Sequence, residues 1–134
     1  MRRTGRCRCG AVTYELDGDL IATAVCHCEH CQRISGSAFS VNLIALPDQL
    51  RTEGPLTTYE ERDDSGETVF VRRSFCPTCG SSILSEMVAT GAIAVKAGTL
   101  DDRREITPTV EVWCEHRQPW AQLPGMAVSL DREA

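Results

Sequence analysis

Alternating hydrophobic and polar residues predict β-strands along much of the chain. In residues 12–16 every second residue is large and apolar, and Asp17-Gly18 ends the run. The same alternation recurs in residues 39–46 and 68–75. Successive side chains of a strand point to opposite faces, so this period of two is typical of half-buried strands. Shorter apolar runs predict further strands at residues 82–84, 93–97 and 110–113.

Turn-forming residues separate these segments, and helical periodicity is nearly absent. Clusters of Asp, Gly, Pro and Gln mark turns at residues 48–49, 53–55, 63–66 and 101–102. The one short helix that the sequence predicts covers residues 29–34 and ends at Gly36. Neither an internal repeat nor an interdomain linker interrupts residues 1–134, and the weakly patterned segment after Gly125 is expected to fray. The sequence therefore predicts a single all-β domain.

Composition and charge narrow the range of partners. The chain has 134 residues and a formal net charge of -5, which argues against a phosphate-binding surface and so against nucleic acid. Arg2, Arg3 and Arg6 form a small basic end, which we expect to be a solvated tail. The first residues lack the apolar run of a secretory signal, and no segment approaches the roughly 18 apolar residues of a membrane span. We therefore expect a cytoplasmic protein without a membrane partner.

Seven of the eight cysteines lie in three tight clusters. They are Cys7 and Cys9, then Cys26, Cys28 and Cys31, then Cys76 and Cys79. Structural disulfides are rare in the cytoplasm, where paired cysteines favour metal or redox roles. The pair Cys76 and Cys79 lacks the surrounding βαβ pattern of a thioredoxin-like redox site. The clusters are therefore interpreted as zinc ligands.

The first and last clusters together supply four thiolates. Cys7 and Cys9 are followed by Gly10, and Cys76 and Cys79 by Gly80, which allows the tight turns that direct backbone amides toward sulfur. Four cysteines close the tetrahedral shell of a structural zinc. Such a site contributes on the order of 10 kcal/mol to folding in small peptides. We therefore expect a structural zinc that joins the two hairpins and stabilises the domain.

The middle cluster supplies only three thiolates. Three protein ligands with an exchangeable fourth are the pattern of catalytic zinc, and a thiolate-rich site suits an incoming thiol. The alternative is a second structural zinc with a protein fourth ligand. The candidates for that ligand are His27, His30, His116, Cys114, a carboxylate or water. His27 is expected to point away from the metal, and Cys114 is more typical of a core cysteine. Spacing alone leaves both interpretations open.

Three ordered motifs give the chain a family resemblance. They are Gly5-x-Cys7-x-Cys9-Gly10, Cys26-His27-Cys28-x-x-Cys31 and Phe75-Cys76-x-x-Cys79-Gly80-Ser81. Together they resemble the glutathione-dependent formaldehyde-activating enzymes, a family that also includes centromere protein V. The resemblance extends from about Gly5 to Trp120. Some members carry a histidine after the late proline, where this chain has Glu111.

The resemblance implies a fold, two metals and a reaction. It implies a β-tent fold, a structural zinc on the four-cysteine set and an active-site zinc on Cys26, Cys28 and Cys31. It also implies that the enzyme is a carbon–sulfur lyase that joins or splits glutathione and formaldehyde through S-hydroxymethylglutathione. His27 and His30 flank the zinc ligands and are the candidate catalytic proton donors, unless they only hydrogen-bond a backbone carbonyl. The alternative function is a zinc-stabilised binding module without catalysis, for which the fourth ligand would be a protein group.

Overall fold

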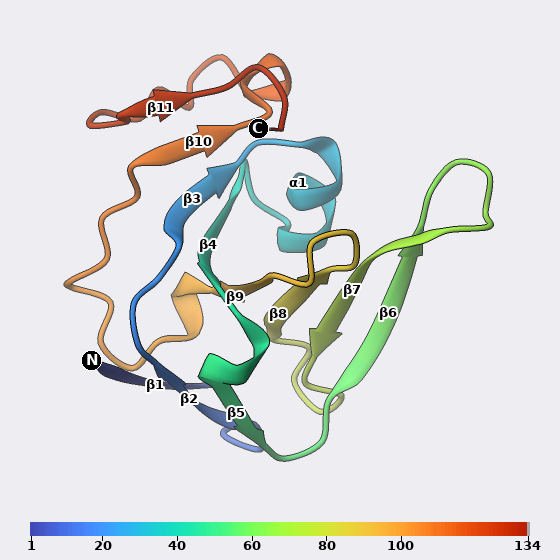
Figure 1. Ribbon diagram of the computed structural model, residues 1–134, viewed down its shortest axis with the longest axis vertical. Helices are drawn as coiled ribbons and strands as arrows, with labels where there is room; N and C mark the ends of the chain where they lie inside the picture. The colour runs from blue at the N-terminus through green and yellow to red at the C-terminus, as the bar shows by residue number, and fades with distance from the viewer. Residues whose placement is uncertain (134) are drawn as a thin grey trace.

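The fold is built from strands in two sheets, with one α-helix. A computed structural model describes residues 1–133, and Figure 1 shows the arrangement of the elements. The smaller sheet has the order β1-β2-β5, formed by Arg2–Arg6, Thr13–Asp17 and Leu50–Glu53. The larger sheet has eight strands in the order β11-β10-β3-β4-β9-β8-β7-β6. The all-β class predicted from the sequence is confirmed, whereas the β-tent shape stays a prediction.

The eight-stranded sheet brings together segments that are distant in the sequence. Its strands are, in chain order, β3 Ala22–Cys26, β4 Ser40–Ala45, β6 Thr57–Arg62, β7 Val69–Phe75, β8 Ser82–Met87, β9 Ile93–Lys96, β10 Val110–Val112 and β11 Val128–Ser129. Most neighbouring strands are antiparallel, but β10 pairs in parallel with both β3 and β11. Three short 3-10 helices complete the described elements, at Pro47–Gln49, Ala97–Thr99 and Cys114–His116.

Two sequence predictions about the termini are wrong. Arg2, Arg3 and Arg6 do not form a solvated tail, because β1 pairs antiparallel with β2 along its whole length. Residues 126–133 do not form a frayed end, because β11 in this segment pairs with β10. Backbone hydrogen bonds need no particular side chain, so polar residues join a sheet when a neighbouring strand is available. Composition alone does not predict which strand lies beside these polar segments.

One face of the large sheet forms the hydrophobic core. The buried side chains of this face and of β2 form one cluster, which includes Val12, Tyr14, Leu16, Leu43, Ala45, Ile83, Ile93 and Val95. In the sequence these apolar residues lie either in alternating segments or in the short apolar runs at residues 82–84 and 93–97. Burying one leucine or isoleucine side chain contributes roughly 1.5–3 kcal/mol. The core therefore fixes the register of the central strands, and with it the residues on the opposite face.

The opposite face of the same sheet lines a cavity of about 270 Å³. Its residues alternate with the core residues along each strand, as the period of two requires. Strand pairing aligns them across the sheet, with Cys26 opposite Ser40 and Asn42 opposite Lys96. In Figure 1 this face lies between α1 with the C-terminal segment and the long β6–β7 hairpin. The cavity is therefore a product of the sheet register.

The helix α1, Glu29–Ser35, covers one end of this cavity and begins at a cysteine. The sulfur of Cys28 caps the helix by accepting a hydrogen bond from the Cys31 amide at 3.3 Å. The helix ends at Gly36, whose left-handed backbone (φ 64°) closes the last turn. The predicted short helix is confirmed. Its first turn holds two sulfurs of the middle cysteine cluster together.

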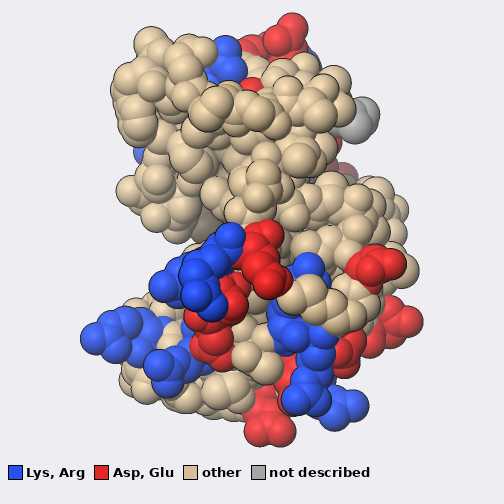
Figure 2. Space-filling model, turned by 90° about the vertical axis from the view of Figure 1, so that its left-hand side faces the viewer, with Lys and Arg blue, Asp and Glu red and all other residues tan. Residues whose placement is uncertain are grey.

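The molecular surface carries both signs of charge. Figure 2 shows Lys and Arg interspersed with Asp and Glu over the lower half of one face, while the upper half is largely uncharged. Interspersed charges do not form the continuous basic surface that attracts phosphates. None of the helices in residues 1–133 has the length and apolar character needed to cross a membrane.

Candidate metal centres and adjoining cavity

The structure brings together the four cysteines of the first predicted site. The sulfurs of Cys7, Cys9, Cys76 and Cys79 lie within 4.8 Å of one another. The Sγ–Sγ distances are 3.6 Å for Cys7–Cys9 and 3.8 Å for Cys9–Cys76. A zinc tetrahedron with bonds of 2.3 Å has edges of about 3.8 Å, so the four sulfurs fit this ion. The two cysteine turns lie at the ends of β1 and β7.

Backbone and side-chain donors stabilise the thiolates of this four-cysteine site. The Val12 amide donates to the Cys7 sulfur at 3.3 Å. The hydroxyl of Ser81 contacts the Cys79 sulfur at 3.2 Å, and this hydrogen bond is the main cause that lowers the pKa of Cys79 to about 5. Zinc requires deprotonated thiols, so donors that favour the thiolate also favour metal binding. The set is complete without a further ligand.

The three cysteines of the second predicted site also converge. Cys26 ends β3, Cys28 caps α1 and Cys31 lies in its first turn, with the three sulfurs within 4.8 Å of one another. No fourth His, Cys, Asp or Glu in residues 1–133 joins this group. Hydrogen bonds with Cys26 and Cys28 lower the pKa of Cys31, whereas hydrogen bonds with Cys28 and Cys31 raise the pKa of Cys26. Three thiolate ligands leave the fourth coordination position of a zinc ion to an exchangeable ligand, and a thiol suits that position.

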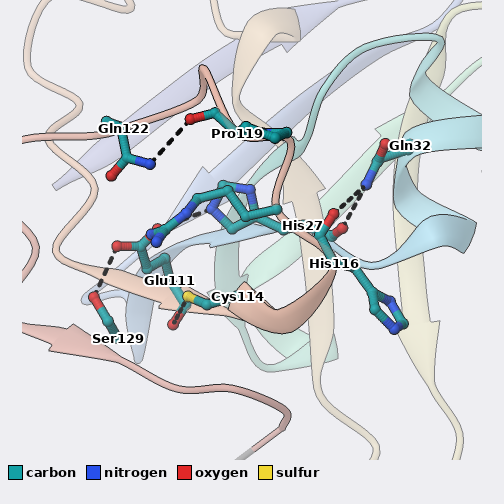
Figure 3. Close-up of polar contacts among 9 residues, drawn as sticks. His27, Gln32, Glu111, Cys114, His116, Pro119, Gln122 and Ser129 are labelled. Carbon is teal, nitrogen blue, oxygen red and sulfur yellow. Dashed lines mark hydrogen bonds and ion pairs between the residues drawn. The ribbon is translucent and has the colours of Figure 1, made fainter.

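The structure places His27 outside the three-cysteine group, as expected. Its ring is fully buried, and Nε2 lies 2.8 Å from a carboxylate oxygen of Glu111 (Figure 3). Glu111 also accepts hydrogen bonds from Ser129 at 2.7 Å and Arg117 at 3.4 Å. Burial opposes ionisation of Glu111, but these hydrogen bonds outweigh it and lower its pKa. His27 is therefore a partner of a buried carboxylate rather than of a backbone carbonyl.

Sequence reasoning missed the structural role of Glu111. It lies in β10 between Val110 and Val112, in a run that was predicted correctly as a strand. A carboxylate in the middle of such a short apolar strand is the signal that could have revealed it, because buried charges need partners. Cys114 lies beside this pair and not beside the three cysteines. Burial is the main cause that raises the pKa of the Cys114 thiol.

His30 faces the cavity and remains about half exposed. Its Nδ1 lies 2.8 Å from Glu61, and its side chain is 54% exposed. The same Glu61 carboxylate accepts hydrogen bonds from buried Arg73, with Nε at 3.1 Å and Nη2 at 3.3 Å. These contacts overcome desolvation and lower the pKa of Glu61. His30 is thus held between solvent and the cavity wall that carries the three cysteines.

The rest of the cavity wall combines apolar and polar side chains. Its apolar side chains include Ile44, Phe70, Val71, Met87, Ala94, Val112 and Trp113. The polar side chains of the wall include Asn42, Ser85 and Lys96, besides His30 with its partner Glu61. A recess that joins apolar surface with directed polar groups is typical of small-molecule sites. His116 also lines the wall, stacked on the Trp113 ring at 5.3 Å, and is not a member of the cysteine group.

Fold and site together define an all-β protein with one complete four-cysteine cluster and one open three-cysteine cluster beside a cavity. Residues 2–116 match the family described as "Glutathione-dependent formaldehyde-activating enzyme". The chain belongs to this family, as its cysteine motifs indicated.

Solved structures include a similar protein. It is a Rhodobacter sphaeroides protein, known from a crystal structure, with 25% sequence identity and a TM-score of 0.60. The alignment covers 78% of this chain and 91% of that one. The comparison with curated proteins gave no match.

Proposed function

We propose that the protein is a zinc-dependent carbon–sulfur lyase that acts on the adduct of a thiol and an aldehyde. The thiol is glutathione or a similar small thiol, and the aldehyde is small. The convergence of Cys26, Cys28 and Cys31 on the wall of a cavity, without a fourth protein ligand in the described residues, carries this proposal. Family membership over residues 2–116 supports the glutathione-dependent chemistry.

Two zinc ions with different roles are proposed. The set of Cys7, Cys9, Cys76 and Cys79 would hold a structural zinc, because four sulfurs satisfy a tetrahedral ion. The set of Cys26, Cys28 and Cys31 would hold the second. When bound there, zinc would supply Lewis acidity that keeps an incoming thiol in its thiolate form. The all-β domain would have the β-tent shape of the family and work in the cytoplasm, where free thiols are kept reduced.

The cavity residues would orient the substrate and carry its proton. In the forward direction the thiolate sulfur attacks the aldehyde carbon, a C–S bond forms, and the carbonyl π electrons move to oxygen. The oxygen then takes a proton, which gives the neutral adduct, and the reverse direction removes that proton and breaks the C–S bond. His30 is the proposed proton carrier, because its hydrogen bond to Glu61 orients the ring and leaves Nε2 for exchange.

His27 is the other histidine expected to take part in catalysis. Its ring is fully buried and is not among the cavity residues. Its hydrogen bond to Glu111 supports a positioning role, because His27 lies between the ligands Cys26 and Cys28. We therefore propose that His27 acts through the loop that carries these cysteines.

The decisive experiment measures metal, thiol binding and turnover on the same preparation. Native mass spectrometry should find two zinc ions per chain and a glutathione adduct that is absent from Cys28→Ser. Exchange spectroscopy by NMR with 13C-formaldehyde and glutathione should show faster formation and breakdown of the adduct with wild-type protein than with Cys28→Ser. Two zinc ions without an adduct and without faster exchange would contradict the enzyme and favour a zinc-stabilised binding module.

A further inference from the structure

Lys96 lies at the end of β9, on the cavity face of the large sheet. It is the only lysine in the chain. It pairs across the sheet with Asn42, just as Cys26 pairs with Ser40 on the adjoining strands. Because side chains alternate, Lys96, Asn42 and Ser40 share one face with Cys26. Lys96 therefore lines the same cavity as the three cysteines.

A short chain of hydrogen bonds holds Lys96 in place. Its Nζ donates to Oδ1 of Asn42 at 2.7 Å. Asn42 is buried, and its Nδ2 donates in turn to Ser40 Oγ at 2.9 Å. An ammonium group has three N–H donors, and within residues 1–133 Lys96 makes this one hydrogen bond and no ion pair. Two donors are therefore left for a ligand in the cavity.

The other cation of the wall is already neutralised. Arg73 donates to both carboxylate oxygens of Glu61, at 3.1 and 3.3 Å, so its charge has a fixed partner. Lys96 shares its wall with the three cysteine sulfurs but makes no ion pair within residues 1–133, and its hydrogen-bond partner Asn42 is neutral. Lys96 is thus the cation of the described wall that remains available to an incoming anionic oxygen.

Ser85 adds a second polar group to this wall. Its Oγ is buried and has no hydrogen-bond partner in the part of the chain that the structure describes. It lies in β8 opposite Ala94, so it shares the cavity face with Lys96 on the neighbouring strand. Buried hydroxyl groups are normally hydrogen-bonded. An oxygen atom of a ligand beside Lys96 would satisfy this one.

We propose that Lys96, assisted by Ser85, binds the oxygen on the carbon next to sulfur in the thiol–aldehyde adduct. The inference rests on the proposed function, since it assumes that the substrate sulfur sits at the three-cysteine cluster. As the C–S bond forms, the carbonyl electron pair becomes an alkoxide, and Lys96 donates a hydrogen bond to it until the proton arrives. A small thiol that carries an anionic oxygen within a few bonds of sulfur would therefore mimic the alkoxide at this site.

The test uses mercaptoacetate and its methyl ester, which differ in the charge of the oxygen group. Isothermal titration of the zinc-loaded protein gives the dissociation constant of each probe. The dissociation constant of the ester is divided by that of the acid, and this ratio is compared between variants. Intrinsic differences between the two probes then cancel. Lys96→Met should lower this ratio about tenfold, because a charge-assisted hydrogen bond is lost. Arg104→Met, which removes an exposed charge outside the cavity, should leave the ratio unchanged.

The measured ratio and the zinc content together decide whether Lys96 binds the oxygen. A lower ratio in Lys96→Met, with two zinc ions per chain by native mass spectrometry, would support it. An unchanged ratio would overturn it while leaving the thiol-binding function intact. Loss of one zinc from Lys96→Met would also overturn it, since Lys96 would then only balance the charge of the cluster. If wild-type protein binds neither probe, both the oxygen site and the proposed function are wrong.

Discussion

The Nε2 atom of His27 lies 2.8 Å from a carboxylate oxygen of Glu111, and both side chains are almost fully buried. Glu111 belongs to β10, which pairs in parallel with β3 and places Glu111 beside Val25. The hydrogen bond therefore joins a late strand to the loop between Cys26 and Cys28. A buried carboxylate bound by three donors is a rigid anchor, so it fixes the position of two candidate zinc ligands.

Glu111→Ala should destabilise the protein by about 2 kcal/mol, because it leaves the buried ring of His27 without its partner. Glu111→Gln keeps a hydrogen-bond acceptor for His27 and should destabilise the protein less than Glu111→Ala does. Urea denaturation of the zinc-loaded proteins measures the free energy of unfolding of both variants. Glu115→Ala is the control, since Glu115 makes a more exposed pair with Arg132 that is worth less than about 1 kcal/mol. Equal stability of Glu111→Ala and Glu115→Ala would contradict the anchor role.

Cys76→Ser should unfold the protein or leave it insoluble. The substitution removes one of four sulfurs from a buried part of the core, and the zinc at such a site contributes directly to folding. Circular dichroism and metal analysis of the expressed protein check this expectation. Soluble, folded protein with two zinc ions would show that the four-cysteine cluster is not a structural metal site.

Cys28→Ser should remove one zinc and leave the domain folded. The three-cysteine cluster lies on the cavity side of the sheet, away from the hydrophobic core that holds Cys7 and Cys76. Native mass spectrometry should find one zinc per chain, and the thermal transition should remain cooperative. Loss of both ions together would mean that the two sites depend on each other, which would contradict their separate roles.

His30→Gln should lower turnover of the thiol–aldehyde adduct by about 100-fold, the typical contribution of a general acid or base. Zinc content and glutathione binding should be unchanged, because His30 is not a member of the cysteine group. Arg33→Gln, on the exposed side of α1 and outside the cavity, is the matched control. If His30→Gln and Arg33→Gln turn over the adduct equally fast, the proton comes from another group.

Gly5→Ala should destabilise the protein by about 1–3 kcal/mol, the usual cost of overpacking. A Cβ atom at Gly5 would collide with the Tyr14 ring and would lie only 2.6 Å from the Thr99 carbonyl oxygen. Gly98→Ala is the control, because a Cβ there meets nothing within 4 Å and the residue lacks a positive φ. Thermal denaturation compares the two variants. Equal melting temperatures would show that the β1–β2 contact relaxes without cost.

Much of the fold followed from local patterns. The alternation in residues 12–16, 39–46 and 68–75 corresponds to β2, β4 and β7, and the short helix ends at Gly36 as expected. These segments were predictable because their buried face repeats every second residue. The strands β1, β3, β5, β6 and β11 were missed. β1 and β6 are largely exposed, so their positions depend on backbone pairing with a neighbour rather than on a pattern of their own.

The sequence by itself determined the three cysteine clusters, because ligand spacing within a turn is a local property of the chain. Cys76-x-x-Cys79 and Cys28-x-x-Cys31 can each direct two sulfurs at one metal through the geometry of a single turn. Only the tertiary structure decided what surrounds them. Lys96 meets Asn42 through strand pairing, and Glu111 meets His27 across 84 residues. Such contacts depend on sheet order and register, which arise from the packing of the whole core and not from any single segment.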